Sequence, residues 1–499
     1  MNQTELNPNL LVRHLDKPSS DFTKQDIIKF ITDQKIEMVN FRYVGGDGRL
    51  KALNFFINSK KHLDELLSTG ERVDGSSLFS FVEAGSSDLY VVPRYKTAFL
   101  NPFSEVPALD ILCSYFNKDG LPLASAPEQV LHKAHETLKA KTGYSLDAMG
   151  ELEYYVSSEI DQLYMATDQK GYHESYPFSK FEMIRCEIMQ AIAQAGGNIK
   201  YGHSEVGNFT RDGVIFEQNE IEFTPVNVED AASQLVVAKW LIRSIGYKYG
   251  VNISFAPKIT VGKAGSGMHI HMRLMKDGKS ATVENGKLSD PARKAIAGIL
   301  DLSPSLTAFG NTIPTSYLRL VPHQEAPTNI CWGDRNRSVL IRVPLGWVGA
   351  NEMIKVANPN YSEAGKDFSE KQTYEFRCPD GSADIYLLLA GLVVGTQHGL
   401  EMKNALEIAE KLYVDVNIFH DEHKAKLATL AQLPNCCWDS ADKLNEQRAA
   451  FELNDVYPKG LIDTMIKRLK SWEDKDLSER LYGKNDEIKA LVDQHLHCC

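Results

Sequence analysis

The stretch that most constrains the fold is short and contains two histidines. It reads Gly265-Ser-Gly-Met-His-Ile-His271 and continues with Met272. A short run that alternates in polarity predicts a β-strand, in which residues i and i+2 lie on the same face. His269 and His271 should therefore point in the same direction, and the glycines allow backbone to approach a bound group closely. Taken alone, the pattern also fits two half-buried strand histidines, so it needs support from the rest of the chain.

Carboxylates with the same spacing occur on other predicted strands. Glu151 and Glu153 are two positions apart in residues 146–157, and further glutamates fall in strand-like segments downstream. A face that carries them all would be a carboxylate basin, formed by Glu151, Glu153, Glu205, Glu220, His269 and Glu375. If that face is exposed to solvent, nothing needs explaining. If it is buried, like charges oppose one another at high cost, and a cation resolves the conflict.

The type of ligand in this set indicates which cation would fit. Many hard oxygen ligands with one imidazole suit Mg²⁺ or Mn²⁺ rather than zinc, and the number of ligands is enough for two sites. An arginine-rich segment, residues 319–342, contains Arg319, Arg335, Arg337 and Arg342 in an otherwise acidic protein. Arginines opposite divalent cations are what a transferring phosphoryl group needs. The chain has neither a Walker motif nor a kinase-type glycine loop, so a nucleotide must be held in another way.

Size and composition restrict the class of protein. A chain of 499 residues, 43% hydrophobic and 24% charged, is long enough for two or three ordinary globular domains. The net charge of −11 gives no support for a nucleic-acid partner. No apolar run is long enough to span a membrane, and the first residues lack the pattern of a secretory signal. Eight cysteines are too few for a disulfide scaffold, so we expect a reducing, cytoplasmic location.

The order of predicted elements divides the chain into four parts. Residues 1–20 are expected to form a loose N-terminal arm. Residues 21–122 predict a small α+β domain that contains a hairpin of residues 38–44 and 50–57 around a glycine-rich turn. Residues 123–420 mix strands and helices and carry the candidate site. Residues 421–499 predict a helical extension of that domain.

Several motifs together resemble one enzyme family. They are Asp74-Gly-Ser-Ser77, Glu151-x-Glu153, Gln218-Asn219-Glu220, Gly265-Ser-Gly-Met-His269-x-His271, Arg319-Leu-Val-Pro-x-x-Glu325-Ala-Pro, Arg335-Asn-Arg337-Ser-x-x-x-Arg342-Val-Pro and Glu375-x-Arg377-x-Pro-Asp380. In this order they resemble the motifs of class I (bacterial-type) glutamine synthetases, over about residues 24 to 420. The resemblance implies an α+β fold with an N-terminal β-grasp domain and a large, creatine-kinase-like catalytic α/β domain. It also implies a double-ring dodecamer with active sites between subunits.

The resemblance implies a role for each matching residue. Two or more Mg²⁺ or Mn²⁺ ions would bind, one held by Glu153, Glu205 and Glu220 and the other, beside the phosphates of ATP, held by Glu151, His269 and Glu375. The glutamate substrate would be bound by Gly265, Arg319 and Arg377. The nucleotide and the phosphoryl group in transit would contact His271, Arg337 and Arg342. Asp74 would take a proton from ammonium in a pocket shaped by Ser77, Tyr172, Glu205 and Glu325, and Glu325 would also close the site.

The implied activity is ATP-dependent synthesis of glutamine from glutamate and ammonia through a γ-glutamyl phosphate. Two alternatives stay open. A γ-glutamyl ligase for an organic amine or polyamine would use the same chemistry, and departures from the family pattern at Ala264, His323 and Gln324 are compatible with it. A non-catalytic relative should have lost metal ligands or Arg337, and these are all present. The segment between Glu205 and Gln218 is also longer than in the family.

Overall fold

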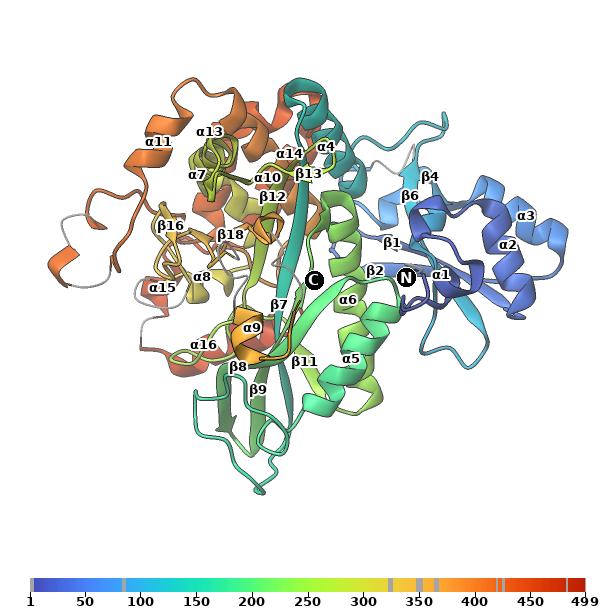
Figure 1. Cartoon of the computed structure of the whole chain (residues 1–499), viewed down its shortest axis with the longest axis horizontal. Helices are drawn as coiled ribbons and strands as arrows, with labels where there is room; N and C mark the ends of the chain where they lie inside the picture. Colours follow the sequence, from blue (N-terminus) through green and yellow to red (C-terminus); the bar gives the residue numbers. More distant parts are fainter. Residues whose placement is uncertain are drawn as a thin grey trace.

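The computed structural model of the chain describes residues 4–82, 87–321, 326–346, 353–362, 368–418, 421–423, 427–481 and 483–498. It contains a six-stranded sheet in the N-terminal part, a ten-stranded sheet in the remainder, and a separate two-stranded ribbon. Figure 1 shows the N-terminal part in blue beside the larger body that holds the second sheet. Both parts combine helices with a sheet, as the element pattern predicted.

The smaller sheet has the strand order β2-β1-β6-β4-β3, with β5 paired to β6. Its strands are β1 (Met38–Val44), β2 (Leu50–Phe56), β3 (Glu71–Asp74), β4 (Asp88–Pro93), β5 (Phe99–Leu100) and β6 (Ala108–Phe116). β1 and β2 form the predicted antiparallel hairpin, and β1 runs parallel to β6. The Asp74 loop therefore follows the edge strand β3.

Short helices accompany this sheet. They are α1 (Leu10–Leu15), η1 (Ser19–Asp21), α2 (Lys24–Asp33), α3 (Lys60–Thr69), η2 (Gly75–Ser77) and η4 (Tyr95–Thr97). Thr23 and Asp26 form a reciprocal capping box that starts α2, because each side chain accepts a hydrogen bond from the other residue's backbone. The expectation of a loose arm is wrong for α1. Leu11 and Val12 are buried in the core of this domain, and the Asn9 side chain caps the helix.

The larger sheet has the strand order β16-β17-β18-β12-β7-β9-β8, with β10 and β11 paired to β7 and β13 paired to β12. Its longer strands are β7 (Ser145–Glu159), β8 (Ile199–Arg211), β9 (Val214–Phe223) and β12 (Met268–Lys276). The shorter ones are β10 (Val226–Asn227), β11 (Asn252–Ser254), β13 (Lys279–Ser280), β16 (Trp332–Asp334), β17 (Ile341–Val343) and β18 (Tyr374–Phe376), while β14 (Val283–Glu284) and β15 (Lys287–Leu288) form the separate ribbon.

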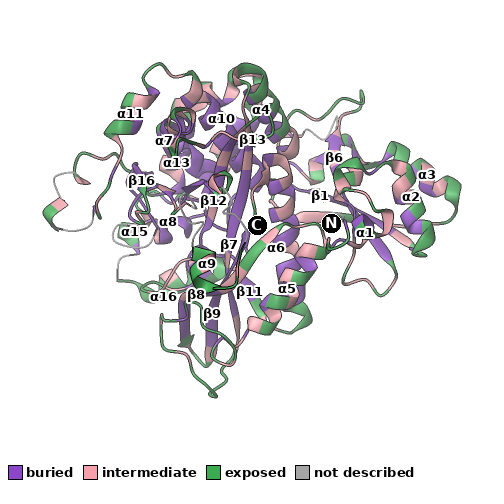
Figure 2. Ribbon diagram, viewed as in Figure 1, coloured by how far each residue is buried: buried purple, intermediate pink, exposed green. Residues whose placement is uncertain are grey.

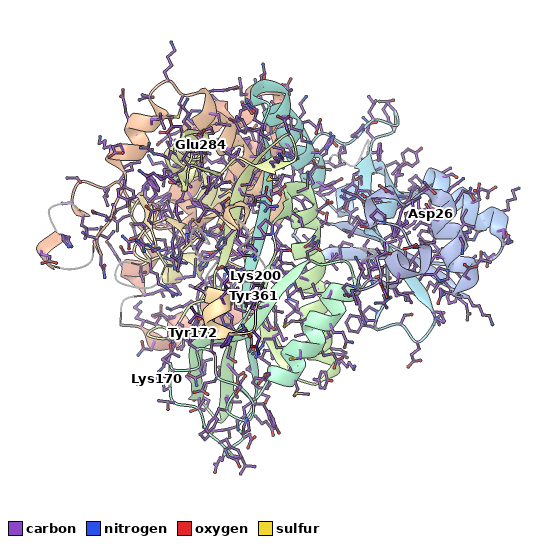
Figure 3. All side chains as sticks on the ribbon, viewed as in Figure 1. Asp26, Lys170, Tyr172, Lys200, Glu284 and Tyr361 are labelled. Atoms are coloured by element: carbon purple, nitrogen blue, oxygen red, sulfur yellow. The ribbon has the colours of Figure 1, made fainter. Side chains whose placement is uncertain are left out.

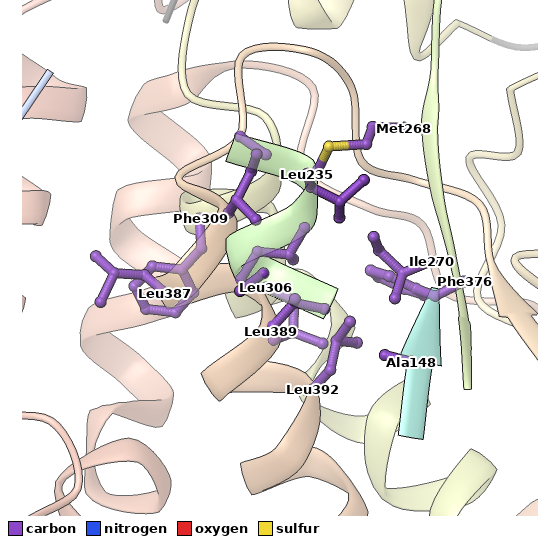
Figure 4. Close-up of a cluster of buried hydrophobic side chains, with 14 of the residues drawn as sticks. Ala148, Leu235, Met268, Ile270, Leu306, Phe309, Phe376, Leu387, Leu389 and Leu392 are labelled. Atoms are coloured by element: carbon purple, nitrogen blue, oxygen red, sulfur yellow. The ribbon is translucent and has the colours of Figure 1, made fainter. Parts of the chain in front are cut away.

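The two faces of this sheet differ because side chains alternate along each strand. On one face, apolar residues meet across strands, as in the pair Ile270 and Phe376. They join the core cluster that Figure 4 shows, where Leu235 and Leu389 come from helices packed against the sheet. On the other face, polar residues meet, as in the pair Glu151 and His269. The apolar face fixes the register of the strands, and that register places the polar residues.

The remaining elements of this part are helices. They are α4 (Pro127–Thr142), α5 (Glu182–Gln194), α6 (Val228–Lys248), α7 (Asp290–Gly310), α8 (Ser316–Arg319), α9 (Met353–Ala357), η6 (Ser369–Lys371), α10 (Ile385–Glu401), α11 (Ala405–Lys411), η7 (Asp421–His423), α13 (Cys437–Glu452), η8 (Leu453–Asp455), α14 (Lys459–Lys470), α15 (Leu477–Arg480) and α16 (Asn485–Gln494). Figure 2 shows β7 and α10 as largely buried elements. α7 and α10 pack closely because Gly298 and Gly399 face each other without side chains.

Within the described residues, no single helix is long and apolar enough to cross a membrane. The pair α10 and α11 passes the same test by length and composition only, and the two helices meet at an angle of 109°.

Candidate active site

The centre of the polar face is built by β7, β12 and β18. The register places His269 opposite Glu151 and His271 opposite Glu375. His269 Nδ1 lies 2.9 Å from Glu151 Oε2 and 3.4 Å from Glu375 Oε1. His271 Nε2 lies 2.8 Å from the other oxygen of Glu151, so the two histidines do share a face. Potential ligand atoms of Glu151, His269 and Glu375 all lie within 4.8 Å of one another.

A second group lies beside the first, on β8 and β9. Here ligand atoms of His203, Glu205 and Glu220 lie within 4.8 Å of one another, and His203 Nε2 is 3.1 Å from Glu220 Oε2. Glu222 closes the gap between the groups, because its carboxylate, that of Glu220 and that of Glu151 also fall within 4.8 Å. The residues of both groups, together with Glu222, His271 and Glu153, form what we call the acidic face.

The segment between Glu205 and Gln218, which we expected to be longer than in the family, forms the end of the β8–β9 hairpin. The two strands continue to a turn at Asp212 and Gly213, both with positive φ, and β8 contains a register shift between Ser204 and Asn208. Glu205 lies within this irregular stretch, which is typical of a β-bulge that redirects a side chain. The hairpin continues beyond this stretch, and Glu205 lies beside Glu220.

The loop that carries Tyr172 is attached to the same irregular stretch. The backbone N–H of Gly171 donates to Val206 O at 3.2 Å, and that of His173 donates to Ser204 O at 2.9 Å. The Tyr172 ring stacks on His173 and meets the ring of His203 edge-on, with 5.5 Å between centroids. Figure 3 labels this side chain, which is half exposed. Tyr172 is thus held at the mouth of the second group.

Three arginines border the acidic face. Arg377 Nε donates to Glu375 Oε1 at 3.0 Å, and Arg342 Nη1 donates to Glu375 Oε2 at 3.1 Å. Arg319 donates to Cys378 O at 2.8 Å, and its Nη2 lies 3.3 Å from His269 Nε2. A cavity of about 40 Å³ opens between these groups, lined by Glu153, Lys258, Ala264, Gly265, His269, Arg319, Ala326 and Arg377.

Charge is unevenly distributed within the acidic face. Burial, together with the charges of Glu151, Glu153, Glu205 and Glu222, raises the pKa of the Glu220 carboxyl well above its usual range. Burial also raises the pKa of Glu153 and of Glu222. The pKa of Glu151 is lowered well below its usual range, because His271 and His269 outweigh the effect of burial. The part around Glu220 therefore holds more negative charge than its neighbours neutralise.

The donor set fits hard divalent cations. Carboxylate oxygens with one or two imidazoles, partly buried and mutually repelling, are ligands that Mg²⁺ and Mn²⁺ accept. The group with Glu151, His269 and Glu375 offers two carboxylates and one imidazole, and so does the group with His203. Each leaves positions for substrate oxygens or water.

Comparison with known proteins identifies the family. The catalytic-domain model of glutamine synthetase matches residues 124–482, and the β-grasp-domain model matches residues 35–118. The chain belongs to the glutamine synthetase family. Glutamine synthetase of Clostridium saccharobutylicum is 32% identical over 440 residues, covering 86% of this chain and 90% of its own. The glutamine synthetase of a Nostoc species is 28% identical over 481 residues, and the match covers 89% of this chain and 94% of the Nostoc protein.

Solved structures of the family share this fold. Plasmodium falciparum glutamine synthetase superposes with a TM-score of 0.74 at 19% identity, covering 93% of this chain and 97% of its own. Ligand-free GmaS superposes with a TM-score of 0.69 at 18% identity, covering 91% and 97%. The predicted fold, a β-grasp domain followed by the large catalytic domain, is thereby confirmed, and the protein is a ligase of this family.

The structure brings most of the predicted site residues together. Those on or beside the acidic face are Tyr172, Glu151, Glu153, Glu205, Glu220, Gly265, His269, His271, Arg319, Arg342, Glu375 and Arg377. Glu153 is held differently from the other glutamates, because its Oε2 accepts hydrogen bonds from Gln218 Nε2 at 3.0 Å and from Gly267 N at 2.7 Å. Arg337 is exposed, and its backbone oxygen accepts a hydrogen bond from Arg377.

Other predicted residues are not part of this assembly. Asp74 and Ser77 lie on the smaller domain, and the exposed Asp74 carboxylate accepts hydrogen bonds from Ser76 and Ser77 of its own turn. Glu325 lies outside the described residues, as do the departures at His323 and Gln324.

Sequence reasoning missed two members of the acidic face, His203 and Glu222. The signal that could have found them is the i, i+2 spacing used elsewhere. His203 precedes Glu205 by two positions, and Glu222 follows Glu220 by two.

Proposed function

We propose that this protein makes glutamine from glutamate and ammonia, with ATP as the phosphoryl donor and a γ-glutamyl phosphate as intermediate. The observation that carries the proposal is the acidic face with three arginines at its rim. The γ-carboxylate of glutamate, the terminal phosphate of ATP and both metals are all charged, so a site for this reaction needs many compensating charges of both signs. Membership of the family supports the same reaction.

The two metal sites are proposed from the geometry and the resemblance together. Glu151, His269 and Glu375 would hold the cation beside the ATP phosphates. Glu205 and Glu220, with Glu153, would hold the other, and His203 lies close enough to contribute. Bound Mg²⁺ or Mn²⁺ would neutralise the phosphate oxygens and the carboxylates around them.

The arginines would divide the binding of the reacting groups. Arg319 and Arg377, which line the cavity with Gly265, would bind glutamate through its carboxylates. Arg342 would contact the phosphoryl group, as would Arg337, and His271 would help to place the nucleotide. Among the described residues, the buried Nε of Arg342 has no hydrogen-bond partner. Buried donors are normally paired, so a phosphate oxygen is a suitable partner for this group.

Ammonium would enter near Tyr172. Glu325 would close the site, and a neighbouring subunit would supply Asp74 and Ser77. Hydrogen bonds from Ser77 and Ser76 lower the pKa of Asp74 to about 2, so its carboxylate is ionised and attracts ammonium. A group this acidic is a weak base. Taking a proton from ammonium therefore requires that desolvation against the next subunit raise the Asp74 pKa.

Assembly and class are proposals of the same kind. We expect a class I enzyme that forms a double-ring dodecamer with active sites between subunits, and a cytoplasmic location. The position of Asp74, exposed on a turn of the smaller domain, is compatible with a role in another subunit.

The test follows phosphate release from ATP by the assembled protein with glutamate and Mg²⁺. Ammonium or a panel of organic amines is added, and the products are identified. Ammonium-dependent release with glutamine formed supports the proposal. Release only with an amine would assign γ-glutamyl-amine synthesis, the alternative left open by Ala264, which lines the cavity beside Gly265. No release with any acceptor would refute both.

A further inference from the structure

His203 is a member of the acidic face for which the family resemblance implied no role. It lies on β8 directly opposite Glu220 on β9, and its side chain is 13% exposed. Its Nε2 lies 3.1 Å from Glu220 Oε2. This separation is close to the ~3.0 Å between adjacent ligands of an octahedral cation with bonds of about 2.1 Å. The two atoms are therefore placed to bind one small cation together.

A hydrogen bond on the other side of the ring determines which nitrogen of His203 can bind metal. His203 Nδ1 lies 3.1 Å from the backbone oxygen of Ser204. A carbonyl oxygen only accepts, so Nδ1 carries the proton of the neutral ring and the lone pair is on Nε2. Histidines that bind metal through one nitrogen commonly donate from the other to a carbonyl or carboxylate oxygen. The Ser204 carbonyl thus orients His203 as a ligand.

Neighbouring groups restrict the ring of His203 further. The rings of His173 and Tyr201 lie beside it, with 4.5 Å and 5.8 Å between centroids. The backbone N–H of His173 donates to the same Ser204 oxygen at 2.9 Å, which ties the Tyr172 loop to this point of β8. His203 also lies on the regular part of β8, just before the register shift that follows Ser204. Its position is therefore set before any cation binds, which lowers the cost of ordering a ligand.

The composition of the second group differs from the one that the resemblance implied. The ligand atoms that lie within 4.8 Å of one another belong to His203, Glu205 and Glu220. Among the described residues, Glu153 belongs to no such group, and its Oε2 already accepts two hydrogen bonds. The second group thus contains an imidazole in addition to carboxylates.

We propose that His203 is a direct ligand of the cation held by Glu205 and Glu220, and that it makes this site prefer Mn²⁺ to Mg²⁺. Mg²⁺ favours oxygen ligands and keeps several waters, whereas nitrogen ligands increase the affinity for first-row transition cations. The inference deepens the proposed function and rests on it, because it concerns the second cation of that reaction. It assigns to the site a cation preference that carboxylates alone do not give.

Binding of Mn²⁺ to the full-length, metal-stripped protein tests this assignment. Electron paramagnetic resonance measures free Mn²⁺ without ATP or glutamate, and Mg²⁺ is added as a competitor. His203→Asn is the test variant, because its amide nitrogen can still donate to the Ser204 oxygen while the ligating nitrogen is lost. We expect one Mn²⁺ site to weaken by about tenfold or more, and the Mg²⁺ affinity of that site to change less than about threefold.

The coupling of bound Mn²⁺ to imidazole nitrogen, measured by pulsed electron paramagnetic resonance, is the second readout. It should decrease in His203→Asn, because a direct ligand is removed. His173→Asn is the matched control, because its ring lies beside that of His203 but belongs to none of the ligand groups that the described residues form. It should keep both the Mn²⁺ affinity and the nitrogen coupling. Equal melting temperatures in EDTA verify that His203→Asn folds, and His203→Gln takes its place if it does not.

Three outcomes would overturn the proposal. The first is an unchanged Mn²⁺ affinity of the His203 variant. The second is an equal loss of Mn²⁺ and Mg²⁺ affinity, which would give His203 no part in selecting the cation. The third is weaker binding with unchanged nitrogen coupling, which would make His203 a positioning residue for Glu220. If the protein binds Mn²⁺ through His203 but releases no phosphate with any acceptor, the proposed reaction is refuted and the ligand assignment stands.

Discussion

Replacing Glu220 by glutamine should change stability and activity in opposite directions. In the metal-free protein, the Glu220 carboxylate lies within 4.8 Å of those of Glu151 and Glu222, and it is 5% exposed. Two unit charges at that separation repel by about 3 kcal/mol at an effective dielectric constant of ~20. His203, at 3.1 Å, offsets part of this repulsion. We therefore expect Glu220→Gln to stabilise the metal-free fold by about 1 to 2 kcal/mol.

With metal present the sign should reverse, because the amide is a poorer ligand than the carboxylate. A cation at a concentration of about 100 times its dissociation constant stabilises the native state by about 2.7 kcal/mol. If the substitution weakens binding about 100-fold, the same concentration contributes only about 0.4 kcal/mol. Activity should then be lost, since a phosphoryl-transfer site without one cation leaves charge uncompensated.

The measurement compares melting temperatures in EDTA and in Mn²⁺, together with ammonium-dependent phosphate release. Glu187→Gln is the matched control, because Glu187 pairs with Lys248 at the surface, away from the acidic face. This variant should keep the protection by Mn²⁺ and the phosphate release of the unchanged protein. Normal turnover of Glu220→Gln at saturating metal would show that Glu220 holds no metal. The same conclusion would follow if Mn²⁺ raised the melting temperatures of Glu220→Gln and of the unchanged protein equally.

Three further substitutions test the packing and the charges. Gly267→Ala should reduce activity strongly and raise the KM for glutamate while the protein still folds, because the added Cβ would lie 2.5 Å from Arg319 Nη2. An unchanged KM would contradict this prediction. Gly298→Ala should destabilise the fold by about 2 kcal/mol, because the added Cβ would lie 2.2 Å from the backbone of α10. Gly460→Ala is the control, because a Cβ at that position meets nothing within 4 Å. Equal urea midpoints for the two variants would refute the packing argument. His132→Asn should cost more stability at pH 6 than at pH 9. The His132 ring donates a hydrogen bond to the Glu229 carboxylate on α6, and this raises the His132 pKa. The pair's contribution to stability is therefore complete below the ordinary pKa of histidine and is lost as pH rises through the raised pKa. A pH-independent difference in melting temperature would contradict this prediction.

Local patterns in the sequence were enough to predict part of the site. Alternation along a strand is a property of the backbone itself, so the spacing of Glu151 and Glu153, and of His269 and His271, predicted shared faces without knowledge of their neighbours. The same applies to the β1–β2 hairpin. The order of the motifs then predicted the glutamine synthetase family and the fold, which the comparisons confirmed, whereas class I stays a prediction.

Only the tertiary structure decided which strands are neighbours. β12 lies between β7 and β18, and this places His269 beside Glu151 and Glu375, which are more than 100 residues away in sequence. Such register depends on the packing of the whole apolar face, which no short window of sequence contains. For the same reason the sequence predicted five glutamates of the acidic face but not that His203 and Glu222 belong to it. The burial that makes their charges costly exists only once the core has formed.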